Sequence, residues 1–385
     1  MHPLGRPGVP SAPRSGTRGQ VLVLVAAGMV AVLVVVGLVV DGGYAFAQQR
    51  GSQNGADAAA TAGALVIAQN LPFRALGQAG TETDADVAAA VHLAATSNAL
   101  GTVEAFYTDI DGNLLSPAVR VGDLGASPPP TAAWGVAVTA TKAFDTFFAR
   151  VVGIFSVTST TDATAVAGYA ESAGAGNVLP VTIPLNIIEC LNNGKFSTLQ
   201  PPTIWPLNEE VILPLCKGPA SGNVGWLDWT PPGGGVPELR DAILHPSNPA
   251  IPIPSWQYVT QTGNINAGQI EDALNTYVGE TVLIPFFDNA CTEPNAPGNS
   301  DCPEGSGPGT GQGNWYHMPL FFGFRMQDVK AAFIQGQNPE CGSEWAGAGC
   351  LIGTITNYVG PNVTIGSGTG TSLDAYSAVG VQLIR

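Results

Sequence analysis

The sequence predicts an α+β protein with an N-terminal transmembrane helix, a small α+β unit and a β-rich, disulfide-stapled C-terminal domain. Three observations support this prediction. Residues 21–40 are uncharged and almost entirely apolar. Residues 71–171 alternate between helix-like and strand-like patterns. All six cysteines follow residue 177, in a part of the chain rich in Gly and Pro, which favours short strands and many turns.

The apolar run of residues 21–40 is long enough to cross a bilayer, because 20 helical residues extend ~30 Å. Arg6, Arg14 and Arg18 precede the run, and Asp41 follows it. The positive-inside rule then leaves residues 1–20 as a cytoplasmic tail and exports the rest of the chain. A cleaved secretory signal is the alternative, since Ala45-Phe46-Ala47 has the form of a cleavage site. We favour a retained anchor, because the run is longer than the core of a typical signal.

Charge is sparse and unevenly distributed. The chain has 14 basic and 29 acidic residues, only 11% of residues are charged, and 45% are hydrophobic. This is enough apolar material for a core and too little charge for a disordered acidic tail. After residue 40 there are 11 basic and 29 acidic side chains. An exported body of this sign repels phosphates, which argues against nucleic-acid binding.

A helical extension is expected over residues 41–70. The glycines in Asp41-Gly42-Gly43 predict a bend or a local break, since each Gly costs a helix ~1 kcal/mol relative to Ala. Seven alanines lie between residues 56 and 68 and leave a narrow surface that another helix can approach closely. Ala59 and Gly63 are therefore candidate partner-binding residues. The helix is expected to end at Leu71-Pro72.

The α+β unit, residues 71–171, begins with a predicted helix over residues 81–98. Thr83 suits the N-cap, and Asp84 and Asp86 lie in the first turn, where the helix dipole favours anions. A hairpin is expected over residues 103–121, because Asp111-Gly112-Asn113 is a strong turn signal. Further along the chain, we expect a strand over 136–141, a short aromatic helix over 144–152 and a strand over 156–170.

The C-terminal domain, residues 177–385, is expected to be β-rich with two helices, over residues 266–277 and 326–335. Its cysteines are Cys190, Cys216, Cys291, Cys302, Cys341 and Cys350. An exported compartment makes disulfides the default, and the spacings favour neighbours, 190 with 216, 291 with 302 and 341 with 350. Zinc is the alternative, but its ligands usually come as closely spaced pairs, and the nearest two cysteines here are nine residues apart.

Motifs for catalysis are missing from the sequence, which contains neither G-x-S-x-G nor H-E-x-x-H. A hydrolytic site would have to use His245 or His317. Residues 109–120 begin like a calcium loop but have Leu114 and Arg120 where Gly and Glu are needed. Glu209 and Glu210 are adjacent and cannot oppose each other across a substrate. We therefore expect no enzymatic activity, no cofactor and no metal.

Tryptophans provide the one cluster with binding potential. Trp226, Trp229 and Trp256 lie close in sequence, with Trp205 nearby. Such side chains can form a platform for sugars or an anchor for a protein partner. They can equally fill the core of a domain with few other large side chains, and we favour the core.

Two stretches resemble the TadE/TadG-like proteins of the Flp (tight adherence) pilus assembly system. The first runs from Arg18-Gly19-Gln20 through the apolar span and Asp41-Gly42-Gly43 to the Ala-rich run of residues 53–64. It departs from the family pattern at Gly55 and Thr61, where Ala and Leu are usual. The second, over residues 136–167, resembles a strand–helix–strand block of the same proteins. The von Willebrand factor A domain of some longer members is not expected, because its D-x-S-x-S metal motif is missing.

The resemblance implies a non-enzymatic component of Flp/Tad-type pilus assembly. Such a protein would be a single-pass protein of the cytoplasmic membrane with its body outside. Its partners would be the membrane and other pilus-system or envelope proteins. The alternative is a cell-envelope module that binds glycan or protein through surface tryptophans, Trp226 and Trp229.

Overall fold

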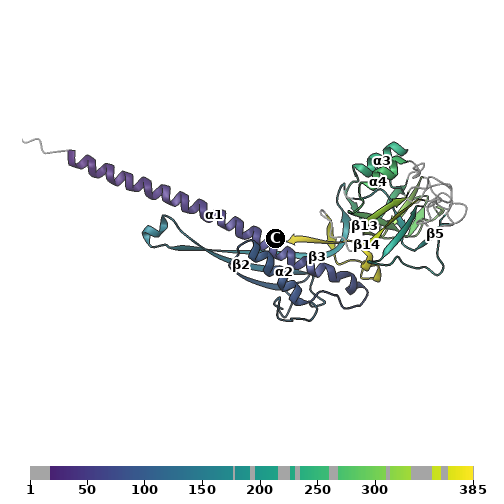
Figure 1. Cartoon of the computed structure of the whole chain (residues 1–385), viewed down its shortest axis with the longest axis horizontal. Coiled ribbons are helices and arrows are strands. Elements are labelled where there is room, and N and C mark those ends of the chain that lie inside the picture. Colours follow the sequence, from purple (N-terminus) through teal and green to yellow (C-terminus); the bar gives the residue numbers. More distant parts are fainter. Residues whose placement is uncertain are drawn as a thin grey trace, which may run out of the picture.

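The computed structural model of the chain describes residues 18–176, 178–190, 196–215, 226–229, 235–259, 268–308, 313–330, 349–356 and 363–384. It is a mixed α/β structure with a long apolar N-terminal helix and a β-rich C-terminal region, as the sequence predicts. Helix α1 (Arg18–Ala75) projects from the body over its first half and lies against the body over its second half (Figure 1).

Helix α1 continues through Asp41-Gly42-Gly43, so a local break at these glycines is wrong. Contacts on this segment offset the cost of the two glycines: Asp41 accepts hydrogen bonds from a neighbouring turn, and Tyr44 packs edge-on against Phe144 and Phe147. The helix also passes Pro72, where we expected it to end. It stops at Ala75, and Gly77 follows with φ +67°. The N–H of Gln78 bonds to the carbonyl of Phe73, which completes a Schellman-type end.

Helix α2 (Asp84–Ser97) confirms the predicted helix and its cap. The Thr83 side chain accepts from the Asp86 N–H, and the Asp86 carboxylate accepts from the Thr83 N–H at 2.8 Å. This reciprocal capping box stabilises the first turn. Val87, Val91 and Ala95 form the buried stripe that faces α1 and the first sheet.

The first sheet is built around three long antiparallel neighbours: β1 (Thr102–Thr108), β2 (Gly135–Asp145) and β3 (Ser156–Ala173). The turn at Asp109–Asn113 forms, with a 2.8 Å bond from the Asp109 N–H to the Asn113 carbonyl. The second arm of the predicted hairpin forms only isolated bridges, at Leu114 and Arg120. The strand that pairs with β1 in the sheet is β2. The predicted helix at 144–152 is also wrong. Strand β2 extends to Asp145, and only the single 3₁₀ turn η1 (Ala149–Val152) follows.

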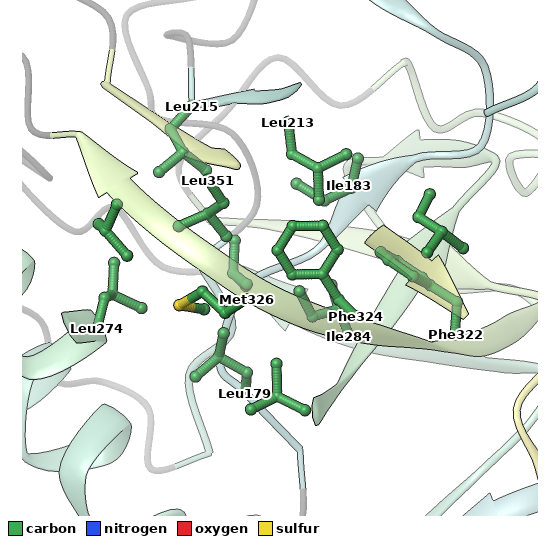
Figure 2. Close-up of a cluster of buried hydrophobic side chains, with 14 of the residues drawn as sticks. Leu179, Ile183, Leu213, Leu215, Leu274, Ile284, Phe322, Phe324, Met326 and Leu351 are labelled. Atoms are coloured by element: carbon green, nitrogen blue, oxygen red, sulfur yellow. The ribbon is translucent and has the colours of Figure 1, made fainter. Parts of the chain in front are cut away.

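The C-terminal region holds a five-stranded sheet in the order β4-β10-β13-β14-β7. Its strands are β4 (Ile183–Pro184), β7 (Glu210–Leu215), β10 (Thr281–Phe287), β13 (Leu320–Lys330) and β14 (Gly349–Thr356). The sheet packs with helices α3 (Val236–Leu244) and α4 (Gly268–Asn275) around a core that includes Phe322, Phe324 and Met326 (Figure 2). Helix α4 confirms the helix predicted over 266–277, whereas α3 was not predicted.

Strand β13 corrects the helix predicted over 326–335. Residues up to Lys330 pair with β14, Val329 opposite Leu351 and Lys330 opposite Cys350, and residues 331–335 lie outside the described residues. Met, Gln, Val and Lys tolerate a helix locally, but pairing with β14 and burial of Met326 and Val329 decide the conformation.

Two smaller sheets complete the region. One holds β9 (Ser255–Val259), β11 (Asn289–Cys291) and β12 (Asn314–Met318), and the other holds β5 (Ile188–Cys190) and β6 (Phe196–Thr198). Three more strands pair with β3 of the first sheet: β8 (Ile251–Pro252), β15 (Thr364–Gly366) and β16 (Val379–Ile384), with the 3₁₀ helix η3 (Ser372–Tyr376) before β16. The first sheet thus contains strands from both sides of residue 177. The division of the chain near that residue stays a prediction.

Candidate membrane anchor and interaction surfaces

The first half of α1 has the exposure of a membrane anchor. Between Val21 and Val40 every large apolar side chain is exposed, from 44% at Val40 to 72% at Leu22. A water-soluble domain buries such a run, since each large apolar side chain gains about 1.5–3 kcal/mol on burial. The helix is long and apolar enough to cross a membrane.

The small-residue face of α1 is occupied by the protein's own fold. Ala56, Ala59, Ala60 and Ala64 are fully buried, in a core shared with α2 and the first sheet. A Cβ on Gly63 would lie 2.9 Å from a methyl of Val91 and 3.0 Å from a methyl of Val136. The close approach that small side chains allow is therefore made within the chain. This placement argues against the predicted role of Ala59 and Gly63 in binding a partner.

The tryptophans are core residues rather than a surface platform. Trp205, Trp226 and Trp256 are 3%, 0% and 7% exposed, and Trp229 is half-buried between two apolar clusters. The indole N–H of Trp205 donates to the Pro184 carbonyl at 2.8 Å. Trp226 as a surface binding residue is therefore wrong, and the envelope-binding alternative loses its main support.

The Cys291–Cys302 disulfide confirms one predicted pair. Cys350 is also disulfide-bonded. Its predicted partner Cys341 lies outside the described residues, as do Cys216 and the side chain of Cys190, so those two pairings stay predictions. The loop of residues 291–302, called the disulfide loop below, is also tied down by side chains. Trp256 Nε1 donates to the carbonyls of Ala296 and Asn299, at 3.3 and 3.2 Å.

The histidines raised as candidates for hydrolysis do not meet. His245 is exposed at the end of α3. His317 is buried on β12, with Nδ1 2.7 Å from Asp288 Oδ1 and Nε2 2.8 Å from the Pro297 carbonyl. Burial alone lowers the pKa of His317, but the hydrogen bonds to Asp288 and Pro297 outweigh it and raise the pKa overall. Nε2 therefore holds the disulfide loop at Pro297, and Nδ1 is occupied by Asp288, just before β11.

The acidic residues singled out in the sequence have structural surroundings. Asp109 accepts from the Asp111 and Asn113 N–H groups within its turn, while Glu209 and Glu210 are exposed. In the part of the chain that the structure describes, no group of three His, Cys, Asp or Glu side chains is arranged to hold a metal. The most buried carboxylate, Asp84, accepts from the Tyr107 hydroxyl and from three backbone N–H groups.

Sequence reasoning missed the role of Asp41. Its carboxylate, 9% exposed, accepts from the N–H groups of Phe147, Phe148 and Ala149, all at the turn between β2 and β3. An Asp directly after an apolar span reads as a topology signal, and nothing nearby in sequence points to a turn more than 100 residues away. The contact ties the end of the apolar span to the hairpin formed by β2 and β3.

Comparison with known proteins identifies one segment of the chain. No curated protein and no solved structure matches the chain significantly. The second stretch of resemblance, residues 136–167, lies outside the segment that a family model matches, and η1 is a single turn rather than the helix of a strand–helix–strand block. Residues 19–69, almost the whole of α1, match the model of the family described as putative Flp pilus-assembly TadE/G-like.

Proposed function

We propose that this protein is a non-enzymatic component of Flp/Tad-type pilus assembly, anchored by α1 in the cytoplasmic membrane with its body outside. One observation carries the proposal: the segment matching the TadE/G-like family is a continuous helix whose first half is apolar and exposed and whose second half is buried in the first sheet. A single rigid element thus joins the membrane to the folded body.

Charge and redox chemistry support the orientation. Arg6, Arg14 and Arg18 precede the span, and basic residues near a span favour the cytoplasmic side. The Cys291–Cys302 disulfide favours an oxidising compartment for the body. The strongly acidic balance after residue 40 also keeps the body away from anionic headgroups, apart from the region next to the helix.

A structural rather than catalytic role is supported by the buried polar side chains. Asp84 holds a loop to the start of α2, and His317, paired with Asp288, holds the disulfide loop to β12 through the Pro297 carbonyl. Catalytic groups instead face a cleft in which a substrate can reach them. The proposal therefore assigns these ionisable groups to the stability of the body.

Labelling of single cysteines tests the orientation. Ser15→Cys places a thiol in the N-terminal tail, and Ala126→Cys places one in an exposed loop of the body. In intact cells, with any outer layers permeabilised, a membrane-impermeant maleimide should label Ala126→Cys and spare Ser15→Cys until the membrane is lysed. The unsubstituted protein gives the background. Labelling of the tail but not of the body would overturn the orientation.

Co-purification tests the assembly role. A tag after Arg385 should recover other pilus-system proteins from detergent-solubilised membranes, and deletion of the gene should reduce piliation. A matched variant replaces residues 21–40 with a Leu/Ala span of equal length, which keeps the anchor and changes its surface. We expect this variant to insert normally and recover less of the pilus system. Full piliation without the gene, together with no recovery of pilus proteins, would contradict the proposal.

A further inference from the structure

The β2–β3 hairpin extends beyond the other strands of the first sheet and runs alongside the projecting part of α1 (Figure 1). Its end, residues 146–155, is called the hairpin tip below. Val151 and Val152 at the tip are 87% and 72% exposed. Four further large apolar side chains of the tip are half exposed or more: Phe147, Phe148, Ile154 and Phe155. Outside the tip and the apolar half of α1, no two exposed large apolar residues of the described body are adjacent in sequence, so this concentration marks an interaction surface.

The hairpin tip lies at the level of the membrane span. One apolar cleft is lined by α1 side chains and by tip side chains, namely Val30, Leu33, Val34 and Leu38 with Phe148, Ala149, Val151 and Val152. A Cβ on Gly37 would lie 2.7 Å from the Cβ of Phe148, so the glycine permits this close approach. Along the helix axis, Val30 lies ~16 Å before Asp41, at a rise of 1.5 Å per residue. The tip therefore reaches about half-way along a span of ~30 Å.

Most backbone N–H groups of the tip are hydrogen-bonded within the protein. Asp41 accepts from the Phe147, Phe148 and Ala149 N–H groups. The N–H groups of Thr146, Val151, Gly153 and Ile154 bond to carbonyls within the tip, and the Thr146 hydroxyl donates to the Ile154 carbonyl. A turn in water needs no such provision, because water can satisfy its amides. A turn in hydrocarbon does need it, since each unsatisfied backbone group costs several kcal/mol there, on the order of its full desolvation.

Charged and aromatic side chains mark the level where the hairpin leaves the hydrocarbon. Tyr44 lies just after the span and packs edge-on against Phe144 and Phe147, with ring centroids 5.7 and 5.1 Å away. Asp145, next to Phe144, pairs with Arg150 at 3.4 Å, so the long Arg150 side chain reaches from the tip towards this level. Aromatic rings gather at membrane interfaces, and long basic side chains extend towards them.

We propose that the hairpin tip inserts into the outer half of the bilayer that α1 spans, with its apolar side chains in contact with lipid acyl chains. The protein is then held at two places, which fixes the rotation of the body about the helix axis. The lipid occupant follows from continuity with the span, since the tip and α1 line one apolar cleft. This inference rests on α1 spanning the membrane, as proposed above.

Fluorescence quenching in vesicles tests the insertion. The full chain is reconstituted in phosphatidylcholine/phosphatidylglycerol vesicles with an environment-sensitive fluorophore on one introduced cysteine. The three probe sites are Val151→Cys on the tip, Val35→Cys on α1 and Ala126→Cys on the body. Probes at 151 and 35 should lose most of their fluorescence when acyl chains carry bromine and should resist aqueous iodide. The probe at 126 should behave in the opposite way.

Each other outcome identifies a separate failure. Quenching of the Val151 probe by iodide, with the Val35 probe still quenched by bromolipid, would overturn tip insertion and leave the anchor intact. If bromolipid also failed to quench the Val35 probe, the membrane anchor itself would be overturned. Resistance of the Val151 probe to both quenchers would indicate that protein, such as a second copy, covers the tip, and would also overturn the lipid assignment. Since Val151 is 87% exposed, its replacement removes little packing.

A charge at the tip provides an independent readout. Val152→Asp, added to the Val151→Cys protein, should expel the tip and shift quenching from bromolipid to iodide, while the Val35 probe stays unchanged. Ile212→Asp is the matched control, because Ile212 is also exposed, at 41%, but lies on β7 in the C-terminal region. It should leave the Val151 probe quenched by bromolipid. Unchanged bromolipid quenching in Val152→Asp would contradict insertion.

Discussion

Asp84 accepts a hydrogen bond of 2.7 Å from the hydroxyl of Tyr107, and both side chains are fully buried. The same carboxylate also accepts from the N–H groups of Gly122, Leu124 and Gly125, at 2.7 to 2.9 Å. Every group that faces Asp84 is a donor, so the site requires an ionised, acceptor-only side chain. Burial and the bond to Asp84 together raise the pKa of Tyr107, which keeps its hydroxyl available as a donor.

The first prediction is that Asp84→Asn destabilises the body strongly. The NH2 group of the new amide would face one of these N–H or O–H groups, and two donors cannot bond to each other. A buried polar group would then lack a partner, at a cost of about 2–3 kcal/mol. Tyr107→Phe removes one donor only and should cost about 1 kcal/mol. Thermal unfolding in detergent, followed by near-UV circular dichroism, measures both. Asp86→Asn on the same helix is the control and should cost less, because Asp86 is exposed. Equal losses in Asp84→Asn and Asp86→Asn would contradict this account.

The second prediction concerns pH and the His317–Asp288 pair. The Pro297 carbonyl can only accept, so Nε2 donates to it, and the ionised Asp288 accepts from Nδ1. The charged imidazolium satisfies both contacts, in line with the raised pKa of His317. The pair therefore stabilises the fold fully below the unfolded-state pKa of about 6.5 and less as pH rises through the folded-state pKa.

Unfolding temperatures at pH 6 and pH 8 provide the measurement. The fold should be more stable at pH 6, and His317→Gln should remove that part of the difference. His92→Gln is the matched control, because His92 is exposed on α2, and it should leave the difference unchanged. An unaltered pH dependence in His317→Gln would count against the prediction.

Local signals in the sequence were enough to predict several elements. The uncharged run of 21–40, the Thr83 cap and the β-branched stretch that became β3 each depend on neighbouring residues, so pattern and chemistry suffice. The errors involve distant residues. Residues 326–330 have no local reason to avoid a helix, and only pairing with β14 makes them a strand.

The candidate sites were harder to predict for the same reason. Small residues such as Ala59 and Gly63 indicate close packing, but not whether the partner is another chain or, as here, α2 and β2 of the same chain. The apolar residues of the hairpin tip were interpreted as a helix. Their turn depends on a carboxylate, Asp41, that only the fold brings to them.

The third prediction is that removing the Cys291–Cys302 disulfide destabilises the C-terminal region. The bridge closes a loop with a sequence separation of 11, for which the loss of unfolded-state entropy amounts to about 2–3 kcal/mol. Cys291→Ala combined with Cys302→Ala should lower the unfolding temperature and speed cleavage within the disulfide loop by an added protease. Glu293→Ala, an exposed change in the same loop, is the control and should cause neither effect. Unchanged cleavage in the double variant would show that the contacts of Trp256 and His317 hold the loop without the bridge.

The last prediction compares two glycines of α1 that face different surroundings. Gly51 is exposed, and a Cβ there meets no atom within 4 Å. Gly51→Ala should therefore stabilise the helix by up to about 1 kcal/mol, the usual gain in helix propensity. Gly63→Ala makes the same gain but places its methyl 2.9 Å from Val91 and 3.0 Å from Val136, in the core between α1, α2 and β2. Overpacking of this kind costs about 1–3 kcal/mol, so the net effect should be destabilising. Thermal unfolding of the two single variants measures this difference in sign.

Two further variants separate the fold from assembly: Val91→Ala added to Gly63→Ala makes room for the methyl and should recover part of the lost stability, whereas Val91→Ala alone should destabilise. If Gly63→Ala kept full stability but no longer recovered pilus-system proteins, the small-residue face would be a binding surface after all.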